Sequence, residues 1–571
     1  MFLGDTPMDH LPAMTLRHVL EETAAKYPDA PALSWVEGEP VTYGELHESV
    51  KALSGWLFEQ GIRFGDSVVI LAENCPHWGM AYFSITSMGA VAVPILTEFH
   101  NEAIQYIIRH SDAKAIFVSE KMFSKIEDAH FGDHLLFINL ETFQIIEHGA
   151  TRDRLREIKS AGAREFRRIK EQAMRHGQQS PQVPGEEDVA VIIYTSGTMG
   201  YSKGVMLTHK NIVFDARAVE AFIDLAPGDK LLSILPLPHT FECTLGLILP
   251  VLNGASVYYL DKPPTARALL PALEKVQPTA MLMVPLVIEK IFRNAVLPRL
   301  TGSFFTRFLY GIPAIRKLMH RKACAQLFKT FGGKLRILAI GGAPLAPVVE
   351  EFLHEGGFPY VIGYGLTECS PLVSGSTVSG TRLYSSGYPI AGVLARIDVP
   401  DERGEGEILI KGPNVMREYY KSPQDTMEVI TGDGWLHTGD LGGIDKEGYI
   451  YIKGRCKNLI LGPSGENIYP EEVEATINQF DYVAESLVIQ HDDKLVARIH
   501  LEADKVDRDF PGLSHEARRE KELELVDKIC KGANGKVHKF IRIARVVLQP
   551  EPFEKTPTQK IKRYLYKSLD S

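Results

Sequence analysis

The stretch that decides the fold covers residues 191–205 and reads Val-Ile-Ile-Tyr-Thr-Ser-Gly-Thr-Met-Gly-Tyr-Ser-Lys-Gly-Val. An apolar run, typical of a buried strand, leads into a loop with four serine or threonine hydroxyls, three glycines and one lysine. Glycines allow the backbone to approach an anion closely, and successive backbone N–H groups can surround that anion. This composition predicts a phosphate-binding loop.

The order of residues in this loop excludes two common nucleotide motifs. A Walker A loop needs glycine, lysine and then serine or threonine, whereas here Ser202 precedes Lys203 and Gly204 follows it. No Gly-x-Gly-x-x-Gly sequence opens a strand-to-helix turn, so a Rossmann dinucleotide site has no support.

Outward from the loop, short apolar runs alternate with helical patterns. Residues 67–71, 115–118 and 135–139 are typical of strands, while 42–57 and 101–110 have helical spacing. Such alternation predicts βαβ units and largely parallel sheets. The fold class expected is therefore α/β.

Bulk composition limits the function classes. The chain has 571 residues, a net charge of −9, six scattered cysteines and no apolar run long enough to span a membrane. Neither a disulfide framework, a zinc site nor a general nucleic-acid surface is indicated. The first 16 residues lack a secretory signal pattern. We expect a cytoplasmic enzyme, with peripheral contact to the inner face of a membrane left open.

Residues 194–204 closely resemble the phosphate loop of the adenylate-forming superfamily, which includes acyl-CoA synthetases, peptide-synthetase adenylation domains and firefly luciferase. Five further segments resemble motifs of that superfamily in the same order: 336–345, 363–368, 435–441, 454–457 and 555–563. The last segment, Lys-Thr-Pro-Thr-Gln-Lys-Ile-Lys-Arg, resembles the long-chain fatty acid branch. Gln559 stands where many members have glycine.

The resemblance implies roles for particular residues. Lys560, Thr195 and Glu368 would be catalytic, and Glu368 would also hold Mg²⁺, a hard cation that suits carboxylate and phosphate oxygens. Contacts to ATP would come from Ser196, Gly197, Thr198, Gly200, Lys203, Gly342, Ala343, Pro344, Tyr364, Gly365, Thr367, Asp440, Ile452 and Arg455.

Among these residues, Tyr364 would stack on adenine, with Ile452 near it. Thr367 would lie near the α-phosphate, Asp440 would bind the ribose hydroxyls, and Arg455 would lie near the ribose or phosphates. His239 falls in a segment that resembles the family's acyl-pocket region, where a wall or gating role and a purely structural role both remain open.

A boundary is expected near 454–457, because the chain becomes charge-rich after a strand-like run and Pro470 opens a helix with acidic residues in its first turn. We expect a large N-terminal multi-sheet α/β adenylation domain, residues 1–454. A small mobile α+β lid domain, residues 455–571, would follow with its hinge at Lys457. By resemblance, the lid rotates after adenylation, removes Lys560 and presents residues 456–470 to the CoA arm.

The function expected is ATP-dependent activation of a fatty acid, through an acyl-adenylate, to acyl-CoA, AMP and pyrophosphate. ATP, Mg²⁺ and CoA would be required. One alternative is a fatty acyl-AMP ligase or acyl-carrier-protein synthetase, because a carrier protein ends in the same thiol arm as CoA. Another is a catalytically silent lipid-binding relative, whose mark would be loss of Lys560, Glu368 or the phosphate loop.

Residues 299–322 combine aromatic and basic side chains. Such a stretch can lie on an anionic membrane, form a packed helix or make a homodimer contact. Chain length and saturation of the substrate, the thiol acceptor, the oligomeric state and the pathway stay open at this level.

Overall fold

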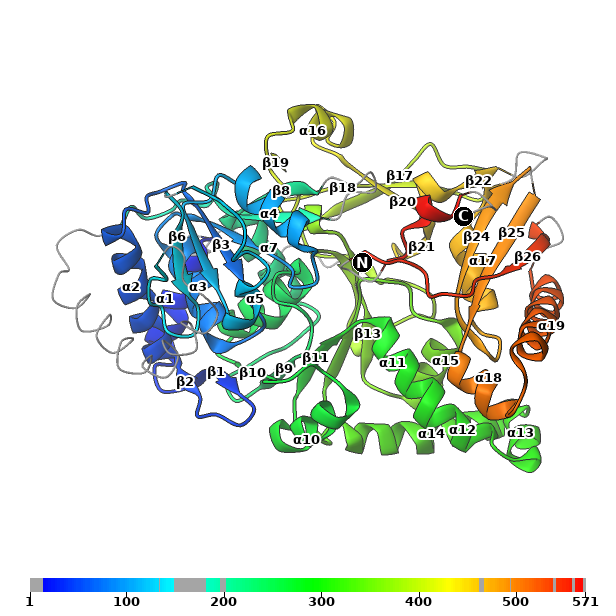
Figure 1. Ribbon diagram of the computed structural model, residues 1–571. Coiled ribbons are helices and arrows are strands. Elements are labelled where there is room, and N and C mark those ends of the chain that lie inside the picture. The colour runs from blue at the N-terminus through cyan, green and yellow to red at the C-terminus, as the bar shows by residue number, and fades with distance from the viewer. Residues whose placement is uncertain are drawn as a thin grey trace.

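The computed structural model describes residues 14–132, 134–147, 181–195, 202–461, 467–492, 494–537, 541–556 and 560–567. Two seven-stranded sheets with helices packed on them form the larger part of the molecule, and smaller sheets lie toward the C-terminal end (Figure 1). This is the multi-sheet α/β fold class that the sequence predicts.

The first sheet has the strand order β13-β12-β11-β9-β10-β1-β2, and every neighbouring pair is parallel except β1 and β2. Its strands are β1 (Pro31–Trp35), β2 (Val41–Thr42), β9 (Lys230–Ser233), β10 (Ser256–Tyr259), β11 (Ala280–Met283), β12 (Ile337–Ile340) and β13 (Tyr360–Ile362). Because carboxyl ends of parallel strands meet at one edge, the segments that follow β9, β12 and β13 come together there.

The second sheet has the order β19-β8-β7-β4-β3-β5-β6. Its strands are β3 (Ser67–Leu71), β4 (Val91–Pro94), β5 (Ala115–Val118), β6 (Leu136–Asn139), β7 (Val189–Thr195), β8 (Lys203–Thr208) and β19 (Glu418–Tyr419). The strands predicted at 67–71 and 115–118 are confirmed, and the third begins one residue later than expected. Every residue of β3 is buried, as expected for a parallel strand with both faces covered.

Helices cover both sheets and fill the space between them. Those before the middle of the chain are α1 (Leu16–Lys26), α2 (Tyr43–Glu59), α3 (Pro76–Ser87), α4 (Asn101–His110), α5 (Glu120–Phe123), α7 (His209–Val219), α8 (Thr240–Glu242), α9 (Leu249–Leu252) and α10 (Ala266–Val276). The capping box that Thr42 and Glu45 predict is present at α2. Nearly all of α3 is buried in the largest apolar cluster, which also contains residues of both sheets.

A helical arm follows β11 along one edge of the molecule, at the bottom of Figure 1. It comprises α11 (Pro285–Ile291), a π-helical turn at Phe292–Val296, α12 (Leu297–Thr301), α13 (Phe304–Tyr310) and α14 (Pro313–Thr330), and α15 (Pro347–Gly356) packs against α14. The capping box of Ser303 and Thr306 fixes the start of α13.

Two antiparallel sheets follow. One contains β14 (Tyr364–Gly365), β15 (Leu372–Gly375) and β16 (Tyr388–Pro389). The other contains β17 (Leu394–Asp398), β18 (Glu405–Lys411), β20 (Leu436–Ile444) and β21 (Ile450–Arg455), and α16 (Pro423–Val429) lies between β19 and β20 in the chain.

We call the residues from 460 onward the C-terminal part, and those before them the larger part. An apolar cluster drawn from residues 460–548 alone forms the core of the C-terminal part. The strands of the C-terminal part are β22 (Ile460–Leu461), β23 (Asn467–Ile468), β24 (Val483–His491), β25 (Lys494–Leu501) and β26 (Ile543–Leu548), and its α-helices are α17 (Pro470–Ile477), α18 (Ala503–Asp509) and α19 (His515–Asn534). Strand β21 continues one residue past the boundary expected after residue 454. The domain limits therefore stay a prediction.

In the parts of the chain that the structure describes, no helix combines the length and apolar character needed to cross a membrane.

Candidate active site

A buried carboxylate on β20, Asp440, lies at the centre of one cluster. Its Oδ2 accepts a hydrogen bond of 2.8 Å from the Tyr364 hydroxyl, and its Oδ1 lies 2.7 Å from Nε of Arg455. The β20–β21 register places Asp440 opposite Arg455. Glu407 accepts from the backbone N–H of Gly439, which has a φ of +68°, and so supports the turn before Asp440. Three expected nucleotide ligands therefore converge on one another.

Burial raises the pKa of Asp440 above its ordinary value. The charges of Arg455 and Lys560 and the hydrogen bond from Tyr364 act in the opposite direction, since each favours the carboxylate. Desolvation also raises the pKa of the Tyr364 phenol, so this residue is a neutral hydrogen-bond donor.

A second cluster connects Glu368 with Lys203. Oε1 of Glu368 accepts a 2.8 Å hydrogen bond from the Tyr419 hydroxyl, while the Lys203 ammonium lies 5.0 Å from the centre of the Tyr419 ring. The same ammonium lies 2.8 Å from Oδ1 of Asp425. Tyr419 is thus shared by the proposed metal ligand and the phosphate-loop lysine. The sequence motifs did not indicate Tyr419 or Asp425.

The expected phosphate loop connects β7 to β8 in the chain, and the two described residues on either side of it, Thr195 and Lys203, pair with each other. Four expected ligands from the loop, namely Ser196, Gly197, Thr198 and Gly200, lie outside the described residues. Gly204 lies where a Cβ would meet Ile192 at 2.9 Å and Tyr420 at 3.2 Å, so the absence of a side chain permits close packing at the loop end of the hairpin.

The turns that follow β12 and β13 form one wall of the candidate site. Gly342, Ala343 and Pro344 are exposed. A Cβ at Gly365 would lie 1.9 Å from the carbonyl oxygen of Pro371, so only glycine fits there. Thr367 begins a short 3₁₀ turn that carries Glu368, and the Glu368 carbonyl accepts from the Met416 backbone N–H at 2.7 Å. The backbone at this wall is therefore closely packed while its rim remains open.

His239 lies beside this wall. Its Nδ1 accepts a hydrogen bond from the Phe241 backbone N–H, and the Phe241 ring lies next to Gly341. Burial, with a smaller effect from the Lys560 charge, lowers the pKa of His239 to about 4. The imidazole is therefore neutral near pH 7 and cannot act there as a fixed cation.

Lys560 reaches the clusters from the C-terminal part. Its backbone exchanges hydrogen bonds with Thr556, which closes a small hairpin. Lys555 pairs with Glu485, and Arg563 pairs with Glu474, so the hairpin is anchored on the C-terminal part itself.

The ammonium of Lys560 faces residues of the larger part, although the residue as a whole remains exposed to solvent. Desolvation and then the Arg455 charge lower its pKa, whereas Asp440 and Glu368 act to raise it. The structure therefore brings Lys560, Asp440, Arg455 and Glu368 into one electrostatic neighbourhood.

The remaining expected residues have less defined surroundings. Ile452 lies on β21 and packs against the main apolar cluster. Lys457 lies in the 3₁₀ turn Cys456–Asn458 that follows β21, and its charge contributes to lowering the pKa of Asp425.

A buried acid near His239 was missed by the sequence reasoning. Oε1 of Glu242 accepts a 2.5 Å hydrogen bond from Ser233, and burial raises the pKa of Glu242 to about 8. A Cβ on Gly246 would clash with its carboxyl group, so these two residues fit together. No motif signals this pair, because a glutamate followed four residues later by a glycine is common on helices.

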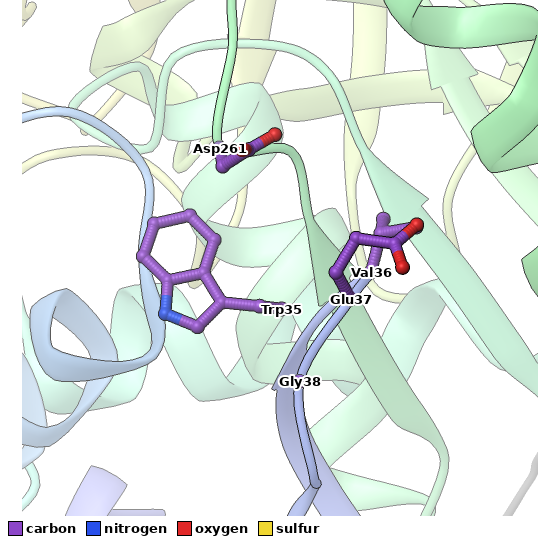
Figure 2. Close-up of a pocket in the computed structure, with 5 residues that line it drawn as sticks. All are labelled: Trp35, Val36, Glu37, Gly38 and Asp261. Carbon is purple, nitrogen blue, oxygen red and sulfur yellow. The ribbon is translucent and has the colours of Figure 1, made fainter.

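A separate hollow of about 270 Å³ lies at the edge of the first sheet, lined by Trp35, Val36, Glu37, Gly38 and Asp261 (Figure 2). None of these residues belongs to the clusters around Asp440 and Glu368. The hollow is therefore not part of the candidate site.

Comparison with known proteins gives consistent results. The family model described as AMP-binding enzyme matches residues 20–420. The human long-chain-fatty-acid–CoA ligase 1 is 28% identical, over 92% of this chain and 80% of its own length. The long-chain-fatty-acid–CoA ligase of Salmonella typhimurium is 30% identical, over 82% of each chain.

Among solved structures, ATP-bound MatB from Rhodopseudomonas palustris superposes with a TM-score of 0.75 at 22% identity. The match covers 98% of this chain and all of that one. The o-succinylbenzoate CoA synthetase of Bacillus subtilis, in complex with its acyl-adenylate intermediate, gives 0.71 at 23% identity, covering 98% and 99%. These two structures support the fold.

Proposed function

Because the chain belongs to the AMP-binding enzyme family, we propose that it activates a long-chain fatty acid with ATP and transfers the acyl group to CoA. Long-chain-fatty-acid–CoA ligases among its relatives support the substrate class. The observation that carries the proposal is the cluster in which Tyr364 and Arg455 hold Asp440, with Lys560 close enough for Asp440, Arg455 and Glu368 to act on its charge. Cationic, ribose-binding and metal-binding groups lie together there, as adenylation requires.

ATP binds along the exposed wall. The ring of Tyr364 faces the adenine, next to the open segment from Gly342 to Pro344. Asp440 accepts hydrogen bonds from the ribose hydroxyls, and Arg455 keeps that carboxylate oriented. The composition of the loop between β7 and β8 suits the phosphates, because its glycines and hydroxyls can offer donors to an anion, and Lys203 adds a charge just after the loop.

In the first half-reaction, a carboxylate oxygen of the fatty acid bonds to the α-phosphorus of ATP while the bond from phosphorus to pyrophosphate breaks. Both reactants are anions, so positioning and electrostatic stabilisation carry most of the catalysis. The Lys560 ammonium contacts the phosphate oxygens as charge builds there. His239 is neutral near pH 7 and forms part of the acyl-pocket wall.

Glu368 fits Mg²⁺. Its Oε1 is held by Tyr419, and no hydrogen bond to Oε2 is found among the described residues. Proteins commonly hold Mg²⁺ through one or two carboxylates together with substrate phosphates. When bound, the ion would neutralise charge on the phosphates, and Tyr419 would keep the carboxylate directed toward it.

In the second half-reaction, the CoA thiol loses its proton to water, its sulfur bonds to the acyl carbonyl carbon, and the bond from that carbon to the AMP oxygen breaks. A thiol with an ordinary pKa suffices, because AMP is a good leaving group. We propose that residues 455–571 rotate about Lys457 between the two steps. The anchoring of the Lys560 hairpin on Glu485 and Glu474 supports this, since the lysine would move with that part.

The test is AMP release from ATP and Mg²⁺ across fatty acids of increasing length, with and without CoA. We expect CoA-dependent release that is greatest for long chains. If acyl-adenylate accumulates and reacts only with the phosphopantetheine of a carrier protein, the acceptor is that carrier protein and not CoA. No adenylate with any fatty acid would overturn the proposal in favour of a silent lipid-binding relative or a different acid.

A further inference from the structure

The helical arm carries an exposed apolar cluster. The exposed fractions are 89% for Phe304, 68% for Phe305 and 65% for Phe308, and Leu318 on α14 is 67% exposed. Phe308 stands four residues after Phe304 and three after Phe305 on α13, so its side chain is a neighbour of both. No residue of α13 is buried. Apolar side chains gathered in this way on a water-facing helix mark an interaction site.

The arm under this cluster is well packed, so the exposure is not that of a loose segment. The Tyr310 hydroxyl and Nε2 of His320 lie 2.9 Å apart, which connects the end of α13 to α14. The His320 ring meets Phe352 edge-on, and Arg316 pairs with Glu355 at 2.6 Å. These contacts hold α14 against α15 and fix the direction in which α13 points.

Charge is segregated around the same cluster. Residues 290–349 contain eleven lysines and arginines and no aspartate or glutamate, in a chain whose net charge is −9. Eight exposed members of this set have no ion pair to any residue that the structure describes, and those nearest to α13 are Arg299, Arg307, Lys317, Arg321 and Lys322. Here we name the phenylalanines 304, 305 and 308, Leu318 and these five cations the arm surface.

We propose that the arm surface docks on the interface of a lipid bilayer that carries anionic headgroups. Exposed aromatic rings next to unpaired cations suit such an interface, because rings enter the boundary between headgroups and acyl chains while cations meet lipid phosphates. A second copy of this chain is a poor occupant, since a two-fold contact through this surface would place unpaired cations against their own copies.

This inference goes beyond the proposed function and does not depend on it, although a substrate that partitions into membranes would be delivered efficiently to an enzyme docked there. The arm lies on the opposite side of the molecule from α16 in Figure 1. Exposed residues on and near α16 therefore serve as controls.

The test is flotation of the full-length protein with vesicles of phosphatidylcholine alone and with phosphatidylcholine mixed with phosphatidylglycerol. We expect binding to the anionic vesicles that is about tenfold tighter than to neutral ones and weaker at high salt. Phe304→Ser/Phe305→Ser/Phe308→Ser should lose about tenfold or more in affinity for anionic vesicles, whereas Met427→Ser, which changes a side chain that is 72% exposed on α16, should bind like the unchanged protein.

A second set of variants tests the role of charge and consists of two double variants with the same net charge. Lys317→Glu/Arg321→Glu should lose the preference for anionic vesicles, while Lys262→Glu/Lys446→Glu, elsewhere on the surface, should keep most of it. Circular dichroism melting checks that every variant folds. Equal vesicle binding by the triple phenylalanine variant, or no binding by the unchanged protein, would overturn the proposal. A concentration-dependent dimer abolished by the triple variant would assign the surface to a second copy instead.

Discussion

The two sides of the candidate site are built differently. Asp440 and Glu368 belong to the larger part, and each carboxylate is oriented by a tyrosine hydroxyl at 2.8 Å. Lys560 lies in a hairpin whose anchors, Glu485 and Glu474, belong to the C-terminal part. The two carboxylates are therefore pre-organised within the larger part, whereas Lys560 keeps its place beside them only while the C-terminal part keeps this orientation. The predictions below test this contrast.

The largest effect on the adenylation rate is expected from a change at Glu368. Glu368→Gln keeps the shape of the side chain but removes the charge that suits Mg²⁺, so we expect adenylation to fall by roughly 10²–10³. The rate is measured as acyl-adenylate formed without CoA at a range of Mg²⁺ concentrations. Glu428→Gln, an exposed position on α16, is the matched control and should be unaffected. Unchanged rates at limiting Mg²⁺ would contradict the assignment of Glu368.

A smaller effect concerns the ionisation of Lys560. Its pKa is lowered from the ordinary value of 10.5, so the ammonium is lost as pH rises through a value below that. Adenylation should therefore be at full strength on the acid side of the lowered pKa and decline above it. Lys560→Arg, whose guanidinium stays charged, should move this alkaline decline to higher pH even if its overall rate is lower. An unmoved decline would mean that another group controls it.

The smallest effect concerns the orientation of the C-terminal part. Arg293 on the helical arm donates to the Val483 carbonyl and to Glu502, both at 2.9 Å, across to that part. Arg293→Ala should slow adenylation by about fivefold, because losing about 1 kcal/mol of such contacts shifts the orientation equilibrium.

The companion readout for Arg293→Ala is thioesterification of supplied acyl-adenylate, which we expect to be unchanged or slightly faster. Arg267→Ala, exposed on α10, is the matched control. Equal slowing of both half-reactions would show that Arg293 supports folding in general rather than one orientation.

The sequence predicted the parts of the fold that depend on local pattern. Within β3, residues 68–71 form a continuous apolar run because both faces of the strand are covered, and the capping box at Thr42 depends on residues only three apart. The motifs also placed Asp440, Glu368 and Lys560 in one site by resemblance, and the structure brings these residues together.

The sequence did not reveal the groups that orient these side chains. Tyr419 reaches Glu368 only because β19 pairs with β8, with Tyr419 opposite Val205, more than two hundred residues away in the chain. Asp425 meets Lys203 through the same long-range pairing. No local period or spacing encodes such contacts. The tip of the phosphate loop, residues 196–201, lies outside the described residues, so its expected ligands stay predictions.

The most direct measurement of the central claim follows the two half-reactions separately in Lys560→Ala, with Lys562→Ala as control because Lys562 pairs with Glu554 on its own part. If Lys560 lies beside Asp440 and Glu368 for the first step alone, its loss should lower the adenylation rate by roughly 10²–10³. The rate of thioesterification of supplied acyl-adenylate should stay within a few-fold of that of the unchanged protein. Equal loss of both half-reactions, with the control active, would contradict the account.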